Sequence, residues 1–527
     1  MSGSGNALRM ADAVDAPRAL RARLALPDEA ATRRLGADLA RALTRGDVVA
    51  LGGDLGAGKS TLARAAIRAL AGSDTLDVPS PTFTLVHTYD GTPPVAHFDL
   101  YRLGGAGELD ELGFEEAAED GIVLVEWPQR APEVEARATI SIALEAGPEG
   151  GRIATIAADP QAGPRLARSL AIRDFLGEAG FGEAPRRAFT GDASARRYET
   201  VAVTEGGVPA TLVLMDSPRQ PDGPPIRDGL PYSRIAHLAE DVVPFVAVAQ
   251  ALTGAGFAAP AIRHADLAAG LLLLDHLGSE TLLDEEGRPV PDRYEAAVLC
   301  LADLHAAALP ATLAVPGGTP YEVPAYDRRA MGIEVELVLD WYMPRVMGRP
   351  ASASERALFT EIWSGLFDEL RAAETGLVLR DFHSPNVIWR PGETGRARIG
   401  LIDFQDAVIG PVAYDVASLA QDARVTIAPE LEARLVSAYV ARRRAEPGFE
   451  PFEFERAYAI MGAQRASKIL GIFVRLLERD GKPQYLRHIP RIRAYLSRTL
   501  GHPSLAALAA LYADWGLTAG EDEAASI

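Results

Sequence analysis

The chain of 527 residues has a net charge of −19 and a single cysteine, and 48% of its residues are hydrophobic. This composition predicts a folded protein of roughly two to four domains. It excludes a disulfide-stapled scaffold and disfavours broad nonspecific binding to nucleic acid or membrane surfaces. No apolar run approaches the length of a membrane helix, and the first residues lack the apolar core of a signal peptide. We therefore expect a cytoplasmic protein that needs no membrane.

The segment from Gly53 to Ser60 fits the phosphate-binding pattern G-x-x-x-x-G-K-[ST] at every defined position. The apolar run 47–51 before it is typical of a buried strand, and residues 61–70 after it are typical of a helix. A glycine loop at a helix N-terminus binds phosphate through main-chain N–H groups, so we expect ATP and Mg²⁺ here. The expected nucleotide-binding residues are Gly53, Asp54, Gly56, Ala57, Gly58, Lys59, Ser60 and Thr61. The alternative is a glycine-rich turn that merely caps a helix.

Two later apolar runs each end in a carboxylate, Asp99 after residues 97–98 and Glu126 after residues 121–125. Asp99 is a candidate for holding Mg²⁺, directly or through water, and Glu126 for orienting or activating the attacking water. Single acids at strand ends are usually just solvated, but two of them behind a phosphate loop favour function. The segment 80–84 is rich in proline and hydroxyl groups, and is either structured near the γ-phosphate or a plain turn.

These motifs together resemble the TsaE family, the ATPase subunit of the bacterial machinery that makes threonylcarbamoyladenosine in tRNA. The resemblance rests on residues 53–60, 80–83, 97–102 and 125–127, in that order. It implies ATP hydrolysis that drives or resets a partner threonylcarbamoyl-transfer complex, with tRNA involved only indirectly. It also implies a switch role for Thr82, Mg²⁺ on Ser60 and Asp99, catalysis by Glu126, and Trp127 beside the nucleotide.

Changes in composition divide the chain into segments. We expect a disordered N-terminus over residues 1–25, the ATPase domain over 26–158, a linker over 159–165, a second domain over 166–517 and a tail over 518–527. No internal repeat relates the two domains, so the second is a different unit.

In the second domain, Asp381 and Asn386 are five residues apart, and Asp403 follows the next apolar run. This order and spacing match the catalytic loop and metal-binding acid of kinases. Asp381 could accept the proton of a substrate hydroxyl, while Asn386 and Asp403 hold Mg²⁺. An earlier strand–loop–strand segment could cover nucleotide phosphates; its candidate contacts are Gly191, Ser194 and Arg196.

This half resembles the aminoglycoside-phosphotransferase-like kinases, and within them the anomeric kinases of N-acetylmuramate and N-acetylglucosamine. The resemblance rests on residues 191–194, 214–216, 381–386, 403–405 and 414–415. It implies a small-molecule sugar as acceptor and a two-lobed, protein-kinase-like α+β fold after the α/β P-loop NTPase domain. The chain is then a bifunctional protein, with ATP and Mg²⁺ as cofactors of both halves.

Two features depart from the kinase pattern. Lysine occurs only at positions 59, 468 and 482, so the strand lysine of protein kinases is missing and Met215 stands near its place. Leu379 replaces the usual histidine two residues before Asp381. The metal ligands remain, which favours an active kinase. The alternatives are a non-catalytic nucleotide-binding or docking module, and a kinase of another hydroxyl compound such as an aminoglycoside or a choline-like alcohol.

Overall fold

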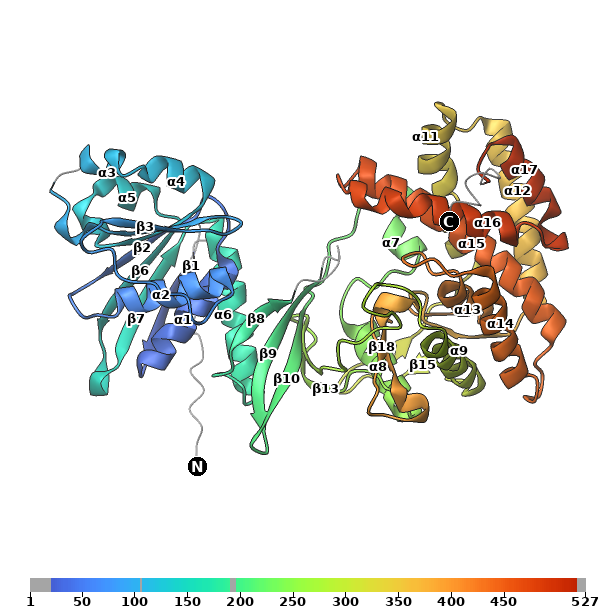
Figure 1. Cartoon of the computed structure of the whole chain (residues 1–527), viewed down its shortest axis with the longest axis horizontal. Helices are drawn as coiled ribbons and strands as arrows, with labels where there is room; N and C mark the ends of the chain where they lie inside the picture. Colours follow the sequence, from blue (N-terminus) through green and yellow to red (C-terminus); the bar gives the residue numbers. More distant parts are fainter. Residues whose placement is uncertain (1–19, 105–106, 190–195, 519–527) are drawn as a thin grey trace. The chain divides into compact units, whose positions relative to one another are not determined.

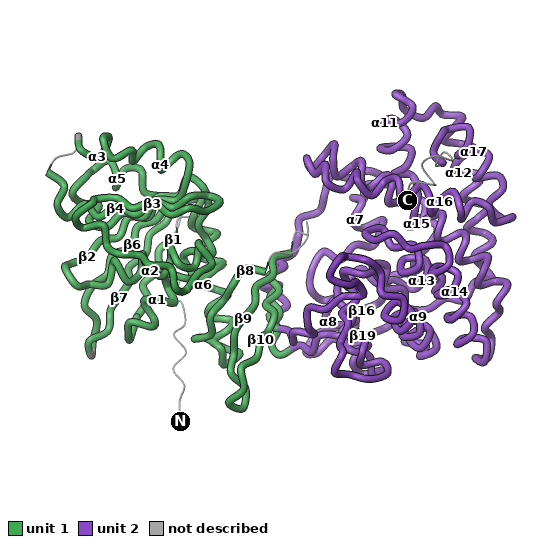
Figure 2. The backbone as a smooth tube through the Cα atoms, viewed as in Figure 1, with its two compact units in different colours: residues 1–216, 263–266, 271–273 green, residues 217–262, 267–270, 274–527 purple. Residues whose placement is uncertain are grey.

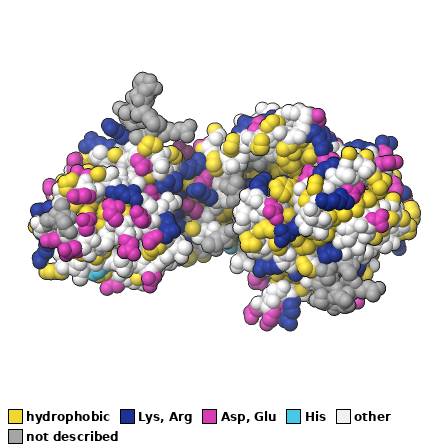
Figure 3. Space-filling view, turned by 90° about the horizontal axis from the view of Figure 1, so that it is seen from above, with side chains coloured by type: hydrophobic (Ala, Val, Ile, Leu, Met, Phe, Trp, Pro, Cys, Tyr) yellow, Lys and Arg dark blue, Asp and Glu magenta, His cyan; other side chains and the backbone are white. Residues whose placement is uncertain are grey.

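The computed structural model describes residues 20–104, 107–189 and 196–518. The chain folds into two compact units (Figure 2). Unit 1 runs to Asp216 and takes in Arg263–Asp266 and Leu271–Leu273, and unit 2 contains the rest of the chain. Unit 1 therefore includes strands that follow the expected ATPase domain. Figure 3 shows acidic and basic side chains interspersed on the face that it draws.

A seven-stranded sheet with the order β1-β7-β6-β2-β5-β4-β3 forms the centre of the ATPase half. The strands are β1 (Leu20–Leu26), β2 (Val48–Gly53), β3 (Val86–Tyr89), β4 (Val95–Asp99), β5 (Ile122–Glu126), β6 (Ile140–Ala146) and β7 (Arg152–Ala158). β2 pairs in parallel with β5 and β6, and β4 pairs in parallel with β5. The carboxyl ends of β2, β4 and β5 therefore meet at one edge of the sheet, where ligands bind in such folds.

Helices cover both faces of this sheet (Figure 1). One face packs against α1 (Glu29–Ala42), α2 (Lys59–Ala71) and α6 (Ala162–Glu178), and the other against α3 (Gly107–Glu111), α4 (Phe114–Asp120) and α5 (Pro132–Arg137). Val48 joins one core and Val49 the other, because successive strand residues point to opposite faces. A Cβ at Gly36 would lie 2.5 Å from the Leu62 carbonyl oxygen, so glycine there lets α1 pack closely against α2. This contact positions the helix that carries Lys59.

Two of the expected segment boundaries are wrong. Residues 20–25, expected to be disordered, form most of β1, which pairs antiparallel with β7 along its whole length. Residues 162–165, expected to be linker, open α6, whose Leu166 and Leu170 enter the core beside α1. The composition of these stretches hid both elements. The first apolar residues of β1 alternate with arginines, and a Gly-Pro pair lies in the first turn of α6.

A five-stranded sheet with the order β13-β14-β10-β9-β8 follows α6. Its strands are β8 (Arg186–Phe189), β9 (Arg197–Glu205), β10 (Val208–Asp216), β13 (Ile262–Asp266) and β14 (Leu271–Asp275). In β9, buried Val201 and Val203 alternate with exposed Ala202 and Thr204, as expected for a sheet with one face buried, whereas the last three residues of β10 are all buried. Met215, buried on β10, occupies the region expected for a strand lysine, and the neighbouring Asp216 pairs with Arg168 of α6 at 2.6 Å.

Unit 2 is mainly helical. Its helices are α7 (Tyr232–Ile235), α8 (Val243–Gly254), α9 (Pro291–Ala306), α10 (Arg328–Val335), α11 (Met343–Met347), α12 (Ala353–Glu369), α13 (Ala413–Ala420), α14 (Pro429–Arg443), α15 (Pro451–Glu478), α16 (Ile489–Thr499) and α17 (Ala506–Asp514). Its short strand pairs are β11 (Pro225–Arg227) with β12 (Leu230–Pro231), β15 (Thr312–Leu313) with β16 (Tyr321–Glu322), β17 (Thr375–Val378) with β20 (Val408–Pro411), and β18 (Val387–Trp389) with β19 (Ile399–Leu401). In the part of the chain that the structure describes, no helix has the length and apolar character to cross a membrane.

Candidate active sites

The phosphate loop connects the end of β2 to the start of α2, as the sequence predicts. Gly53, Gly56 and Gly58 have φ values of 129°, 80° and 106°, which side chains other than glycine rarely adopt. A Cβ at Gly53 would also lie 2.3 Å from the Leu144 carbonyl oxygen. No side chain caps the N-terminus of α2, so its first N–H groups remain available to an anion.

Lys59 lies in the loop with only 4% of its surface exposed. Its Nζ donates to the main-chain oxygens of Gly53 at 2.8 Å and Asp54 at 2.9 Å, and lies 3.8 Å from the centre of the Trp127 ring. Burial lowers the pKa of Lys59, although the carboxylates of Glu126, Asp99 and Asp54 act to raise it. Partners that a phosphate could displace thus hold the ammonium group inside the loop.

Asp99 and Glu126 lie side by side, because β4 and β5 pair in parallel with these two residues in register. Glu126 Oε2 accepts a hydrogen bond from the Ser60 hydroxyl at 2.8 Å, and Oε1 lies 3.0 Å from His97 Nε2. A carboxylate at the end of β5 is thus joined directly to the last residue of the phosphate loop.

Asp99 is held by the segment 80–84. Its Oδ2 accepts hydrogen bonds from the hydroxyls of Thr82 at 2.7 Å and Ser80 at 3.0 Å, while Oδ1 accepts from the Tyr101 main-chain N–H. The segment is therefore structured around the site and is not a plain turn. Trp127 has a left-handed φ of 62° and its ring lies 5.0 Å from that of Tyr101, which aims it at Lys59.

Sequence reasoning did not assign roles to His97 or Arg152. His97 is 1% exposed and its Nδ1 has no partner among the described residues, so Glu126 is its one polar side-chain contact there. Its position two before Asp99, on the same side of β4, was an available signal. Arg152 on β7 donates to the main-chain oxygens of Ala57 and Gly56 at 3.0 and 3.2 Å. No local pattern predicts this contact, because it depends on how distant strands pair.

The second site forms in unit 2 where the strand pair β18–β19 brings its flanking residues together. Val387 pairs with Leu401, so Asn386 before one strand meets Asp403 after the other. Asn386 Nδ2 donates to the Asp381 main-chain oxygen at 2.9 Å and lies 3.3 Å from Asp403 Oδ2. Gln405 Nε2 donates to Asp403 Oδ1 at 3.0 Å. The three residues singled out by spacing therefore do lie together.

Buried acids hold the loop that carries Asp381. Asp415, fully buried at the start of α13, accepts hydrogen bonds from the main-chain N–H groups of Leu379 at 2.6 Å and Arg380 at 2.9 Å. Asp422 accepts one from the Ser384 N–H at 2.8 Å. Arg380 has a φ of 68°, so these bonds hold a conformation that the residue would rarely adopt alone.

The carboxylate of Asp381 is 43% exposed and, within the described residues, accepts no hydrogen bond. Burial acts to raise its pKa, but His383, Lys468 and Arg380 act against this, and the net effect lowers the pKa. Asp381 is therefore ionised at neutral pH, with its oxygens available to accept a hydrogen bond from a hydroxyl. The His383 imidazole lies 4.0 Å away, and burial lowers its pKa.

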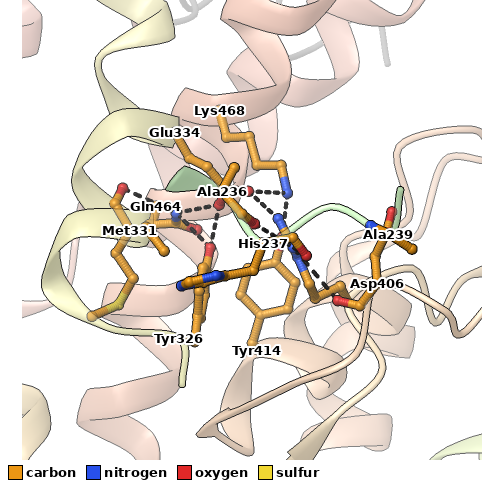
Figure 4. A network of polar contacts seen from close by, with 12 residues as sticks. Ala236, His237, Ala239, Tyr326, Met331, Glu334, Asp406, Tyr414, Gln464 and Lys468 are labelled. Atoms are coloured by element: carbon orange, nitrogen blue, oxygen red, sulfur yellow. Dashed lines mark hydrogen bonds and ion pairs between the residues drawn. The ribbon is translucent and has the colours of Figure 1, made fainter. Parts of the chain in front are cut away.

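A buried polar network stands behind this loop. Figure 4 shows Glu334, Tyr326, Gln464 and Lys468 pointing toward one another. Glu334 forms ion pairs with Arg380 and, at 2.9 Å, with Lys468, and Gln464 donates to it at 3.1 Å. Burial acts to raise the pKa of Glu334, but Lys468 and Arg380 lower it to about 2. Through Glu334, Arg380 next to Asp381 is thus held against α10 and α15.

Both sites offer oxygen ligands suited to Mg²⁺. These are the Ser60 hydroxyl with Asp99 in one, and the Asn386 amide with Asp403 in the other. Across residues 20–104, 107–189 and 196–518, no three His, Cys, Asp or Glu side chains cluster as metal ligands. Mg²⁺ bound with nucleotide commonly takes its other ligands from phosphate and water. The proposed contacts Gly191 and Ser194 lie outside the described residues, while Arg196 is half-buried just before β9.

These two sites define a P-loop nucleoside-triphosphatase domain followed by a protein-kinase-like phosphotransferase domain. Residues 26–153 match the family "Threonylcarbamoyl adenosine biosynthesis protein TsaE", and residues 185–452 match the "Phosphotransferase enzyme family". The chain belongs to both families, one in each half, and both imply the use of ATP.

Each half of the chain is similar to proteins with a named function. The N-acetylmuramate/N-acetylglucosamine kinase of Caulobacter vibrioides is 37% identical over 66% of this chain and 96% of its own length. The tRNA threonylcarbamoyladenosine biosynthesis protein TsaE of Rickettsia felis is 39% identical over 25% of this chain and 78% of its own. Among solved structures, Bacillus subtilus YdiB is 28% identical, with a TM-score of 0.24, over 31% of this chain and 99% of its own.

Proposed function

We propose that the protein is a bifunctional enzyme. Its first half hydrolyses ATP in support of tRNA threonylcarbamoyladenosine synthesis, and its second half transfers phosphate from ATP to the anomeric hydroxyl of N-acetylmuramate or N-acetylglucosamine. The observation that supports the proposal is that the candidate residues of each half lie in contact, in a chain whose two halves have relatives with these two names. The reactions belong to the cytoplasm, where ATP and tRNA are found.

In the first half, the loop and Lys59 bind the phosphates, and Ser60 and Asp99 would hold Mg²⁺. Glu126 is the residue placed to orient or deprotonate water, since it already joins the loop hydroxyl to His97. Thr82 would report on the γ-phosphate, because its hydroxyl is bound to the carboxylate proposed to hold the metal. A switch of this kind suits an ATPase that acts through a threonylcarbamoyl-transfer complex and reaches tRNA only indirectly.

In the second half, Asn386 and Asp403 would hold Mg²⁺, which neutralises charge on the transferring phosphoryl group. Asp381 receives the sugar hydroxyl and accepts its proton as the oxygen bonds to the γ-phosphorus, while the bond from that phosphorus to the bridging oxygen breaks and ADP leaves. The ordered loop positions this carboxylate before the substrate arrives, which lowers the entropy cost of the reaction. Gly191, Ser194 and Arg196 remain proposed phosphate contacts.

The ATPase proposal predicts a split between two variants of the full chain. Glu126→Gln is expected to bind ATP with near-normal affinity but to lose partner-stimulated hydrolysis by a factor on the order of a hundred, because the general base is gone. Lys59→Ala is expected to lose one of two bound nucleotide equivalents in calorimetry, since it removes a charge-assisted contact. Lys482→Ala, which alters a lysine outside both sites, is the control. No stimulation of the wild type by a competent transfer complex would contradict the proposal.

The kinase proposal predicts ADP release that depends on sugar. The full chain carrying Lys59→Ala, which silences the first site, is incubated with ATP and with anionic N-acetylmuramate, neutral N-acetylglucosamine, or cationic kanamycin and choline. We expect turnover with the two N-acetyl sugars and a product whose phosphorus resonance couples to the anomeric proton. Turnover with only the cationic acceptors would favour the alternative that the second half phosphorylates an aminoglycoside or another alcohol. If no acceptor supports turnover, the result would favour a docking role for the second half.

A further inference from the structure

Unit 1 contains a basic groove along α2, and Thr61, directly after the phosphate loop, is one of its lining residues. It has a volume of about 680 Å³ and is bordered by α1, α2 and the residues 183–188 that lead into β8. Eight arginines line it against three acidic residues, although the chain as a whole has a net charge of −19. Both halves of the sequence contribute to it, since α1 and α2 belong to the TsaE half and Arg187 to the segment after it.

Five of these arginines have acidic partners. Arg33 pairs with Glu29, Arg34 with Glu183 and Arg187 with Asp74. Arg173 and Arg186 both pair with the buried Asp38. These pairs neutralise part of the charge of the groove.

The other three, Arg41, Arg64 and Arg68, have no carboxylate partner among the described residues. Each donates to a main-chain oxygen, those of Ala69 at 2.8 Å, Val78 at 3.0 Å and Leu76 at 2.8 Å. Arg64 and Arg68 use only Nε for this, which leaves their paired Nη groups for another acceptor. The buried Nε of Arg41 also has no partner in the described chain.

The chemistry of the groove defines its ligand. Guanidinium forks bind phosphate in a two-pronged manner, and half-buried ones bind it more strongly than exposed ones. The volume falls in the range of small-molecule sites. Within the described residues no aromatic side chain lines the groove, and the apolar wall is made of small residues such as Ala37 and Ala65. A nucleobase would find no ring to stack on.

We propose that this groove binds a small phosphate ester without a nucleobase, of the sugar-phosphate class, with Arg64 and Arg68 as its phosphate ligands. Arg64 and Arg68 are one turn apart on α2, the helix that begins with Lys59 and Ser60. The ligand therefore contacts the helix that starts at the phosphate loop. The product proposed for the second half belongs to the same chemical class; that link rests on the proposed function, but binding to the groove does not.

The test is equilibrium dialysis of the full chain with labelled N-acetylglucosamine 1-phosphate, under saturating Mg·ADP so that the nucleotide sites are filled. The double variant Arg64→Gln/Arg68→Gln is expected to lose one bound equivalent, with affinity at that site reduced by a factor on the order of a hundred. Arg21→Gln/Arg23→Gln, which removes the same charge from exposed positions of β1, should bind as the wild type does. Because the ester is supplied ready-made, the result does not depend on kinase activity.

Further variants and competing ligands in the same dialysis experiment test the groove and its class of ligand. Unchanged binding in a folded double variant overturns the proposal. If that variant does not fold, Ala37→Glu, which places a carboxylate in the groove wall, must abolish the same equivalent. If equimolar inorganic phosphate displaces the probe, the sugar adds nothing to the affinity. If equimolar AMP displaces it, the groove also accepts a nucleobase. Either result overturns the sugar-phosphate assignment.

Discussion

Replacing Asp381 by Asn is expected to lower kcat for sugar phosphorylation by a factor on the order of a hundred or more, with little change in Mg·ATP affinity. The substitution keeps the shape of the side chain but removes its ability to accept a proton. The carboxylate is 43% exposed, and its ionic contact with the His383 imidazole is long, at 4.0 Å, so little of the fold depends on its charge. Its proposed contact with the acceptor hydroxyl strengthens mostly in the transition state, and the loss should therefore appear in kcat.

Asp403→Asn is the matched comparison, because it makes the same change at the other neighbour of Asn386 with a different expected result. Asp403 would hold Mg²⁺ together with Asn386, so its loss should weaken Mg·ATP binding and shift the metal dependence to higher concentration. Initial rates of both variants, titrated with ATP, Mg²⁺ and N-acetylmuramate, separate the two patterns. Asp340→Asn, at a surface ion pair, controls for the substitution itself. Full activity in both site variants would contradict the kinase proposal.

The sequence predicted the parts of the sites that depend on short segments. The phosphate loop needed only the eight residues 53–60. The sequence also singled out Asp99 and Glu126 as acids at strand ends, and the register of β4 and β5 shows in addition that they lie side by side. The five-residue spacing from Asp381 to Asn386, with one strand pair before Asp403, was enough to predict that the three meet. In each case the candidate residues lie in or next to short turns, and a short sequence pattern is enough to predict such turns.

The contacts that support those sites could not be predicted in the same way. Arg152 reaches the phosphate loop from a strand about a hundred residues further on, and Asp38 of α1 binds Arg173 and Arg186 beyond the expected domain boundary. Asp38 has no local signal, since a buried acid on an amphipathic helix looks like a surface acid until its partner is known. The same reason hid Glu334, whose partners Arg380 and Lys468 are distant in sequence.

Glu334→Gln is expected to destabilise unit 2 by about 3 kcal/mol, because it leaves Arg380 and Lys468 buried without their counter-ion. The estimate agrees with a pKa lowered from 4.5 to about 2, which corresponds to a similar free energy. Scanning calorimetry of the full chain should show the transition of unit 2 roughly 5 °C lower, and that of the ATPase half unchanged. Glu478→Gln, which breaks an exposed pair with Arg345, should change the melting temperature little.

The pH dependence distinguishes this ionic role from simple packing. Because the pKa of Glu334 is depressed in the folded protein, its contribution is fully present above the unfolded value of 4.5 and is lost as the pH falls toward 2. The difference in melting temperature between the wild type and Glu334→Gln should therefore be constant from pH 8 to pH 5 and shrink below about pH 4.5. A difference that stays constant through this acid range would mean that Glu334 acts through hydrogen bonds and shape alone. In that case the charge on Arg380, next to the proposed base Asp381, is balanced by some other group.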